Sequence, residues 1–136
     1  MGDFGNDFTF IPIGIYKLYT ASRYNIPVMT EYKSGENVSY AICDLTNMYE
    51  QNGASYAQRG VLMNKEGGYV LIRDIITSDL PIEYYWFMHT KADVELSADG
   101  KSALLIQDGR RLWVGIIDGD GTFTVESATP LETSPN

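Results

Sequence analysis

The composition of the chain is typical of a folded, acidic protein of one domain. It has 136 residues, and its 44% hydrophobic and 21% charged residues lie outside the range of disordered sequences. Eighteen acidic residues against ten basic ones give a formal net charge of −8, which disfavours binding to the phosphates of nucleic acid. The single cysteine excludes an intrachain disulfide, and no apolar run approaches the ~20 residues of a membrane-spanning helix.

The first 35 residues are rich in aromatic side chains but lack regularly spaced turns. Pro12 and Pro27 interrupt this region, and proline is tolerated in sheets mainly on edge strands. We therefore expect irregular edge strands joined by a longer loop. The opening run MGDFGNDFTF has neither the basic nor the apolar region of a secretory signal.

From residue 38 to residue 128, short runs rich in Val, Ile, Leu, Tyr and Trp alternate with glycine-containing breaks. The spacing of roughly ten residues is typical of antiparallel sheets. Helical periodicity is confined to 45–52, which predicts one or two helical turns at most. We expect strands at 38–44, 55–63, 68–76, 82–90, 92–97, 102–107, 110–117 and 122–128.

The pair Asp108-Gly109 is the strongest local signal in the chain. It lies between two apolar runs, and a two-residue type I′ turn requires positive φ at both central positions. Several runs, YVLIRDII among them, are nearly continuous in apolar residues, which favours strands covered on both faces. The sequence therefore predicts an all-β fold, an antiparallel two-sheet β-sandwich over residues 1–128, followed by a flexible tail at 129–136.

The run DGDGT at 118–122 is similar to the start of a calcium-binding EF-hand loop. The loop positions that require Gly and Glu hold Phe123 and Thr129 instead. A turn between two strands accounts for this run better, and we expect no metal ion or other cofactor.

His89, the only histidine, has no accompanying nucleophile motif and no further His or Cys ligands. We expect it to pack in a strand beside Trp86 and Met88 and to donate one ring N–H to a carbonyl oxygen. The alternative is a polar contact with a sugar or with a neighbouring domain. Arg59 and Asp74 lie on neighbouring predicted strands, which predicts a cross-strand ion pair rather than a substrate contact.

An ordered series of short motifs runs through residues 39–117. It comprises Tyr40, Asp44, Thr46 and Tyr49, then Arg59-Gly60, then Ile72 to Asp74, then Pro81, Tyr84, Trp86, Met88, His89 and Thr90. In this order the residues resemble the carboxy-terminal β-sandwich of heparinase II/III-like polysaccharide lyases. The resemblance covers somewhat over half of the chain and points to a fold family rather than to a substrate.

The resemblance implies a β-sandwich that closes over an amino-terminal helical toroid carrying much of the active site. Such enzymes cleave uronate glycans by β-elimination, in which a base removes the C5 proton and a Tyr or His protonates the leaving oxygen. No helical toroid is predicted here, so no catalytic residue is assigned. The family's His-Asn pair corresponds to Tyr24-Asn25, and the implied substrate-binding residues are Tyr24, Asn25 and His89.

We therefore expect a lyase module that supports or partly lines a glycan cleft and is inactive alone. Its partners would be a polysaccharide or a helical lyase domain, and its compartment would be periplasmic or extracellular. One alternative is a free-standing carbohydrate-binding module with a row of exposed aromatic rings. Another is a structural or protein-interaction sandwich with buried rings and an exposed apolar patch. The exposure of Tyr84, Trp86 and Trp113 distinguishes the two.

Overall fold

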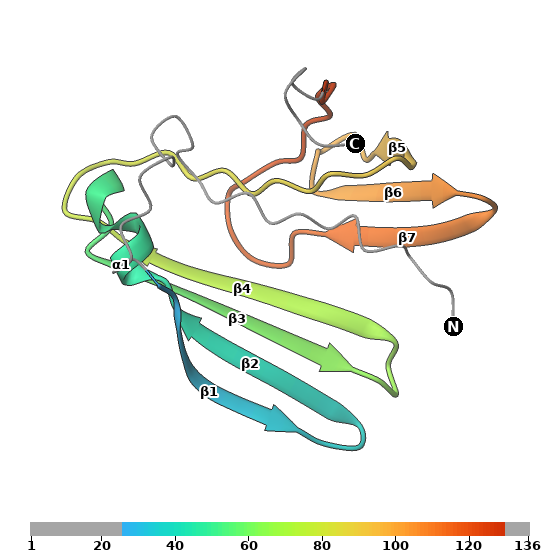
Figure 1. Ribbon diagram of the computed structural model, residues 1–136. Helices are drawn as coiled ribbons and strands as arrows, with labels where there is room; N and C mark the ends of the chain where they lie inside the picture. The colour runs from blue at the N-terminus through green and yellow to red at the C-terminus, as the bar shows by residue number, and fades with distance from the viewer. Residues whose placement is uncertain (1–25, 130–136) are drawn as a thin grey trace. The chain divides into compact units, whose positions relative to one another are not determined.

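The computed structural model describes residues 26–129 of the chain (Figure 1). Their contacts divide them into two compact units, which we call the N-terminal unit, residues 26–86, and the C-terminal unit, residues 87–129. The N-terminal unit contains a four-stranded sheet and the C-terminal unit a three-stranded sheet. Every strand pair is antiparallel, so the expected all-β class with two antiparallel sheets is confirmed.

The N-terminal sheet places its strands in chain order. They are β1 (Val28–Ser34), β2 (Val38–Asp44), β3 (Tyr56–Asn64) and β4 (Tyr69–Thr77). The edge strand β1 begins directly after Pro27, as the preference of proline for edge strands predicts. Its register against β2 shifts between Met29 and Glu31, an irregularity that is common on edge strands.

A short helical segment connects β2 to β3. Helix α1 (Thr46–Tyr49) continues into the 3₁₀ turn η2 (Glu50–Asn52), which agrees with the predicted helical segment at 45–52. The side chain of Asp44 accepts a 2.8 Å hydrogen bond from the first backbone N–H of α1. Gly53 ends the segment with φ of +93°, a conformation that glycine adopts without strain. Within residues 26–129, no helix is long and apolar enough to span a membrane.

The C-terminal sheet is built around the predicted tight hairpin. Its strands are β5 (Asp93–Leu96), β6 (Ser102–Gln107) and β7 (Arg110–Gly115), paired in that order. Asp108 and Gly109 have φ of +50° and +73°, and Gln107 pairs with Arg110. Two central residues with positive φ are the signature of a type I′ turn, so this prediction is confirmed.

Two predicted strands are absent from the structure. Residues 82–90 and 122–128 form no strand hydrogen-bond ladder. An apolar, aromatic run has the propensity for a strand, but a strand also needs a neighbour with unpaired backbone groups. Among the described residues, neither run forms a ladder with another strand, and Phe123 makes a single backbone hydrogen bond to Gly100. The DGDG run is therefore a bend with no second strand after it, and it is held by Lys101, whose Nζ donates to the carbonyl oxygens of Gly119 and Gly121.

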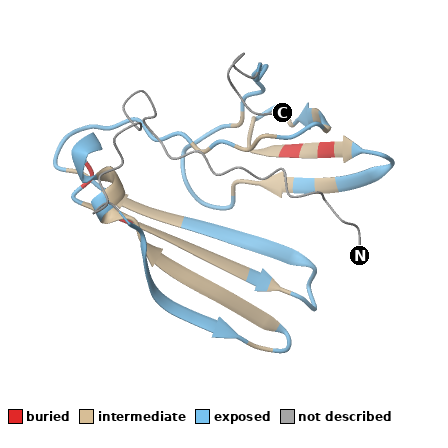
Figure 2. Ribbon diagram, in the orientation of Figure 1, coloured by how far each residue is buried: buried red, intermediate tan, exposed pale blue. Residues whose placement is uncertain are grey.

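Few side chains of the described residues are buried (Figure 2). The buried hydrophobic residues are Ala54 and Ala57 in the N-terminal unit and Ala103 and Leu105 in the C-terminal unit. Strand β4 was expected to be covered on both faces, but its residues from Tyr69 to Arg73 are exposed. Its apolar run therefore forms surface in the described part of the chain.

Replacing Gly109 with alanine should lower the free energy of unfolding by about 1 kcal/mol, because a Cβ is unfavourable at φ of +73°. The space around Gly109 is open, so the loss reports backbone strain alone. Gly121→Ala, in the same unit and without positive φ, is the matched control and should change stability little. Urea denaturation followed by circular dichroism measures both, and equal losses would contradict the type I′ turn.

Candidate functional site

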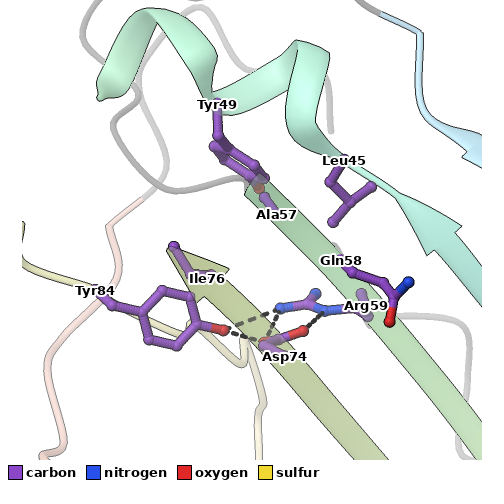
Figure 3. A pocket seen from close by; sticks show the side chains of 8 residues that line it. All are labelled: Leu45, Tyr49, Ala57, Gln58, Arg59, Asp74, Ile76 and Tyr84. Carbon is purple, nitrogen blue, oxygen red and sulfur yellow. Dashed lines mark hydrogen bonds and ion pairs between the residues drawn. The ribbon is translucent and has the colours of Figure 1, made fainter. Parts of the chain in front are cut away.

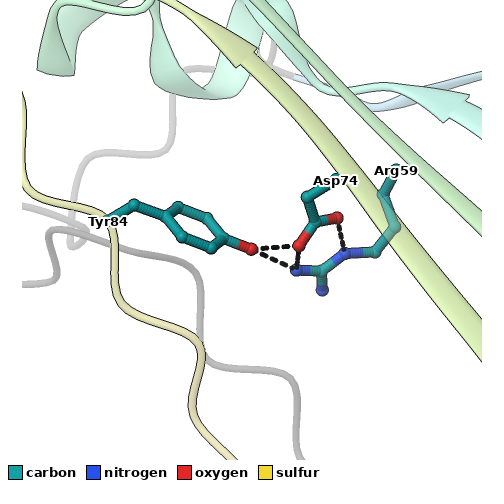
Figure 4. Close-up of polar contacts among 3 residues, drawn as sticks. All are labelled: Arg59, Asp74 and Tyr84. Atoms are coloured by element: carbon teal, nitrogen blue, oxygen red, sulfur yellow. Dashed lines mark hydrogen bonds and ion pairs between the residues drawn. The ribbon is translucent and has the colours of Figure 1, made fainter. Parts of the chain in front are cut away.

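Arg59 and Asp74 form a bidentate ion pair on one face of the N-terminal sheet (Figure 4). They occupy directly opposite positions on β3 and β4, so their side chains leave the sheet on the same side. The guanidinium donates from Nε to Oδ1 and from Nη2 to Oδ2, both at 2.6 Å. The cross-strand ion pair expected from the spacing of these residues is confirmed.

Tyr84 completes the cluster from the irregular segment that follows β4 (Figure 4). Its hydroxyl donates a short hydrogen bond to Oδ2 of Asp74 and accepts one of 3.3 Å from Nη2 of Arg59. The segment is anchored at its start, where Ser78 Oγ donates to the carbonyl oxygen of Gly53 at 2.7 Å. The sequence placed Tyr84 in the expected strand 82–90 and contained no signal for this contact, which depends on the path of the chain after β4.

The electrostatics of the cluster favour the charged pair and the protonated phenol. Arg59 and Asp74 are only 19% and 15% exposed, so solvent screens their attraction less than at an open surface. The hydrogen bonds that the Arg59 guanidinium donates to Asp74 raise its pKa. Burial, and then the hydrogen bond to Asp74, raise the pKa of Tyr84 well above its ordinary value of 10.0.

These shifts limit what the cluster can do chemically. A phenol with a raised pKa stays protonated at neutral pH, so Tyr84 can donate a hydrogen bond but is a poor general base. Its proton is already directed at Asp74, and the Asp74 carboxylate is shared between Tyr84 and Arg59. The cluster is therefore a clamp that fixes the segment after β4 to the sheet.

A small pocket lies beside the clamp (Figure 3). It is lined by Leu45, Tyr49, Ala57, Gln58, Arg59, Asp74, Ile76 and Tyr84. Its volume of about 210 Å³ includes the part that is open to solvent. This is below the roughly 300–1,000 Å³ of typical ligand sites, so the pocket does not have room for a sugar chain.

Of the three residues implied as substrate contacts, only His89 lies within the described residues. Tyr24 and Asn25 lie outside the described residues. His89 lies in the irregular segment 82–90 of the chain and belongs to the C-terminal unit, whereas the clamp belongs to the N-terminal unit. Its Nε2 is buried without a hydrogen-bond partner in the described part of the chain.

The three aromatic residues that distinguish the alternatives differ in their exposure. Tyr84 is 41% exposed and Trp113 is 69% exposed, whereas Trp86 is half-buried. Between residues 26 and 129, no three His, Cys, Asp or Glu side chains are grouped so that they could hold a metal ion. No protein-family model matches the chain, and the comparisons with curated proteins and with solved structures found no match.

Asp74→Asn should lower the free energy of unfolding by about 1–3 kcal/mol, because it leaves the half-buried guanidinium of Arg59 without its counter-charge. Tyr84→Phe should cost about 1 kcal/mol or less, since Tyr84 is partly exposed. The double variant should lose less than the sum, because both changes remove the same hydrogen bond. Urea denaturation measures this cycle.

The exposed pair Glu31 and Tyr40 provides the control for this cycle. Tyr40 also donates its hydroxyl to a carboxylate oxygen, but both side chains lie near solvent on β1 and β2. Glu31→Gln should therefore cost less than Asp74→Asn. Strictly additive losses for Asp74→Asn and Tyr84→Phe would show that the clamp does not act as a unit.

The raised pKa of Tyr84 makes stability depend on alkaline pH. The folded state holds the phenolic proton more tightly than the unfolded state, so its contribution is complete below the ordinary pKa of 10.0 and is lost as the pH rises above it. The free energy of unfolding of Tyr84→Phe should fall less between about pH 8 and about pH 11 than that of the unmodified chain. Tyr32→Phe controls for the loss of a surface phenol, and parallel declines for all three would refute the assignment.

Proposed function

We propose that the chain is a β-sheet module of a heparinase II/III-like polysaccharide lyase, which supports or partly lines a glycan cleft and is not catalytic itself. The ordered motifs of residues 39–117 support the family, and the antiparallel sheets are compatible with it. The observation that carries the proposal is how few of the apolar side chains between residues 26 and 129 are buried. A module that works against another domain leaves such surface for that domain to cover.

Strand β4 is the clearest example of this uncovered surface. Tyr69 and Val70 are each 53% exposed, and the next two residues, Leu71 and Ile72, are also exposed. Successive residues of a strand point to opposite faces, so this run presents apolar side chains on both sides of the sheet. Contiguous exposed apolar surface of this kind marks an interaction site in a soluble protein.

The proposed lack of catalysis is supported by the chemistry of the clamp. The reaction requires a base for the C5 proton, and the Tyr84 phenol is protonated and engaged with Asp74. The pocket beside it is smaller than a sugar-binding site. His89 Nε2 has no hydrogen-bond partner among the described residues.

The alternatives differ in the aromatic side chains that they expose. The exposure of Trp113 favours a module that contacts glycan, because a purely structural sandwich would bury its rings. The exposed apolar run on β4 favours contact with another protein domain. A module that docks on a lyase domain and also faces the glycan accounts for both features.

The proposal predicts binding without turnover. Incubation of the chain with heparan sulfate, chondroitin, hyaluronan or alginate should release no unsaturated uronate, because the Tyr84 phenol of the clamp stays protonated and bonded to Asp74. In native gels, hyaluronan or alginate in the matrix should slow the chain, relative to an acidic protein that binds no glycan. Robust turnover would contradict the lack of catalysis, and unretarded migration in every uronate gel would contradict the glycan role.

A further inference from the structure

We infer that Trp113 and Arg111 form a platform on strand β7 that binds a uronate-bearing sugar chain. The inference rests on the proposed glycan role and adds to it a site and a chemical class of ligand. Strand β7 is the terminal strand of the C-terminal sheet. Because side chains alternate along a strand, Arg111, Trp113 and Gly115 lie on the same face of this sheet.

This face is the one turned away from the buried residues of the unit. Ala103 and Leu105 of β6 are buried and pair with Val114 and Leu112 of β7. Residues that pair directly point to the same side, so these four side chains share the packed face. Trp113 pairs with Leu104 and therefore lies on the opposite face, where its exposure of 69% shows that it contributes little to the core.

Gly115 lets the indole of Trp113 lean along the strand. A Cβ at position 115 would lie 2.9 Å from Cζ3 and 3.2 Å from Cη2 of the Trp113 ring, so the ring would have to shift to make room for it. The absent side chain therefore gives the six-membered ring its place beside the backbone. An indole supported in this way offers apolar contact area to the C–H groups of a sugar.

Arg111 adds a charge to this aromatic surface. It is exposed and makes no hydrogen bond or ion pair with the other described residues. Two positions along a strand separate it from Trp113, roughly 7 Å. A free guanidinium binds a carboxylate through two parallel N–H donors, so a sugar that stacks on Trp113 and carries a carboxylate matches both groups.

The acidic residues of the same face restrict the ligand further. Through the strand pairing, Asp93 and Glu95 of β5 lie in line with Arg111 and Trp113 on the same face, two strands away. Two strand spacings amount to roughly 10 Å, about one screening length at physiological salt. These carboxylates would repel a densely sulfated chain, so the platform should prefer uronate chains with about one charge on each uronate, such as alginate or hyaluronan.

The test compares variants of the full chain by calorimetric titration with alginate, hyaluronan, heparin and dextran oligosaccharides. Trp113→Ala should weaken binding of alginate or hyaluronan by about tenfold or more. Arg111→Gln should weaken it severalfold and reduce its dependence on salt, because the lost contact is ionic. Arg110→Gln, on the other face of β7, is the matched control and should bind like the unmodified chain.

Gly115→Ala is a second test, since it keeps the indole of Trp113 but displaces it. The affinity of this variant for alginate or hyaluronan should also fall. Full binding by both Trp113→Ala and Gly115→Ala would overturn the platform and leave the glycan role intact. Equal binding of dextran and uronate oligosaccharides, or preference for heparin, would overturn the ligand class. Absence of binding by the unmodified chain to any of them would reject the platform and the proposed glycan role together.

Discussion

The pairing of β3 with β4 is the constraint on which the N-terminal unit depends. The two strands pair without interruption from Tyr56 opposite Thr77 to Asn64 opposite Tyr69. With little apolar burial to hold the sheet, this ladder of backbone hydrogen bonds determines which side chains meet. A shift by one residue would turn Asp74 to the face opposite Arg59 and abolish the clamp.

The register of β3 and β4 also positions a segment outside the sheet, because it forms the ion pair that Tyr84 contacts. Tyr84 reaches Arg59 and Asp74 from a segment that has no ladder of its own, so its position depends on side-chain hydrogen bonds. The ion pair is half-buried and has each of its hydrogen-bonding carboxylate oxygens occupied, an arrangement suited to holding a chain segment in place. The same arrangement explains why the cluster is a poor acid–base catalyst, since its proton and its charges are committed to one another.

In the C-terminal unit, one face of the sheet is packed and the other face is exposed. Small or branched residues on β6 are buried on one face, while the largest side chain of β7 stands exposed on the other. Alternation along the strands produces this division, and the glycine two residues after Trp113 leaves room for its ring. In a sheet of this kind, the packed face can provide stability while the exposed face binds a ligand.

Local signals in the sequence predicted most of the strands. The bounds of β2 and β6 agree with the expected 38–44 and 102–107, and the Asp108-Gly109 turn has the expected positive φ angles. These features depend on neighbouring residues, whose alternation and turn chemistry are visible in the sequence. The expected strands at 82–90 and 122–128 failed because strand formation also requires a pairing partner, which a residue pattern does not specify.

In the candidate sites too, contacts across one hairpin could be predicted, whereas contacts from irregular segments could not. The spacing of Arg59 and Asp74 around one hairpin was sufficient to predict their ion pair, because the register of a hairpin follows from its turn. The sequence by itself thus determined the all-β class, the Asp108-Gly109 hairpin and the ion pair between Arg59 and Asp74. Only the tertiary structure decided that Tyr84 completes the clamp, that β4 is exposed and that Trp113 faces solvent, because exposure and contacts across irregular segments depend on what the rest of the chain leaves uncovered.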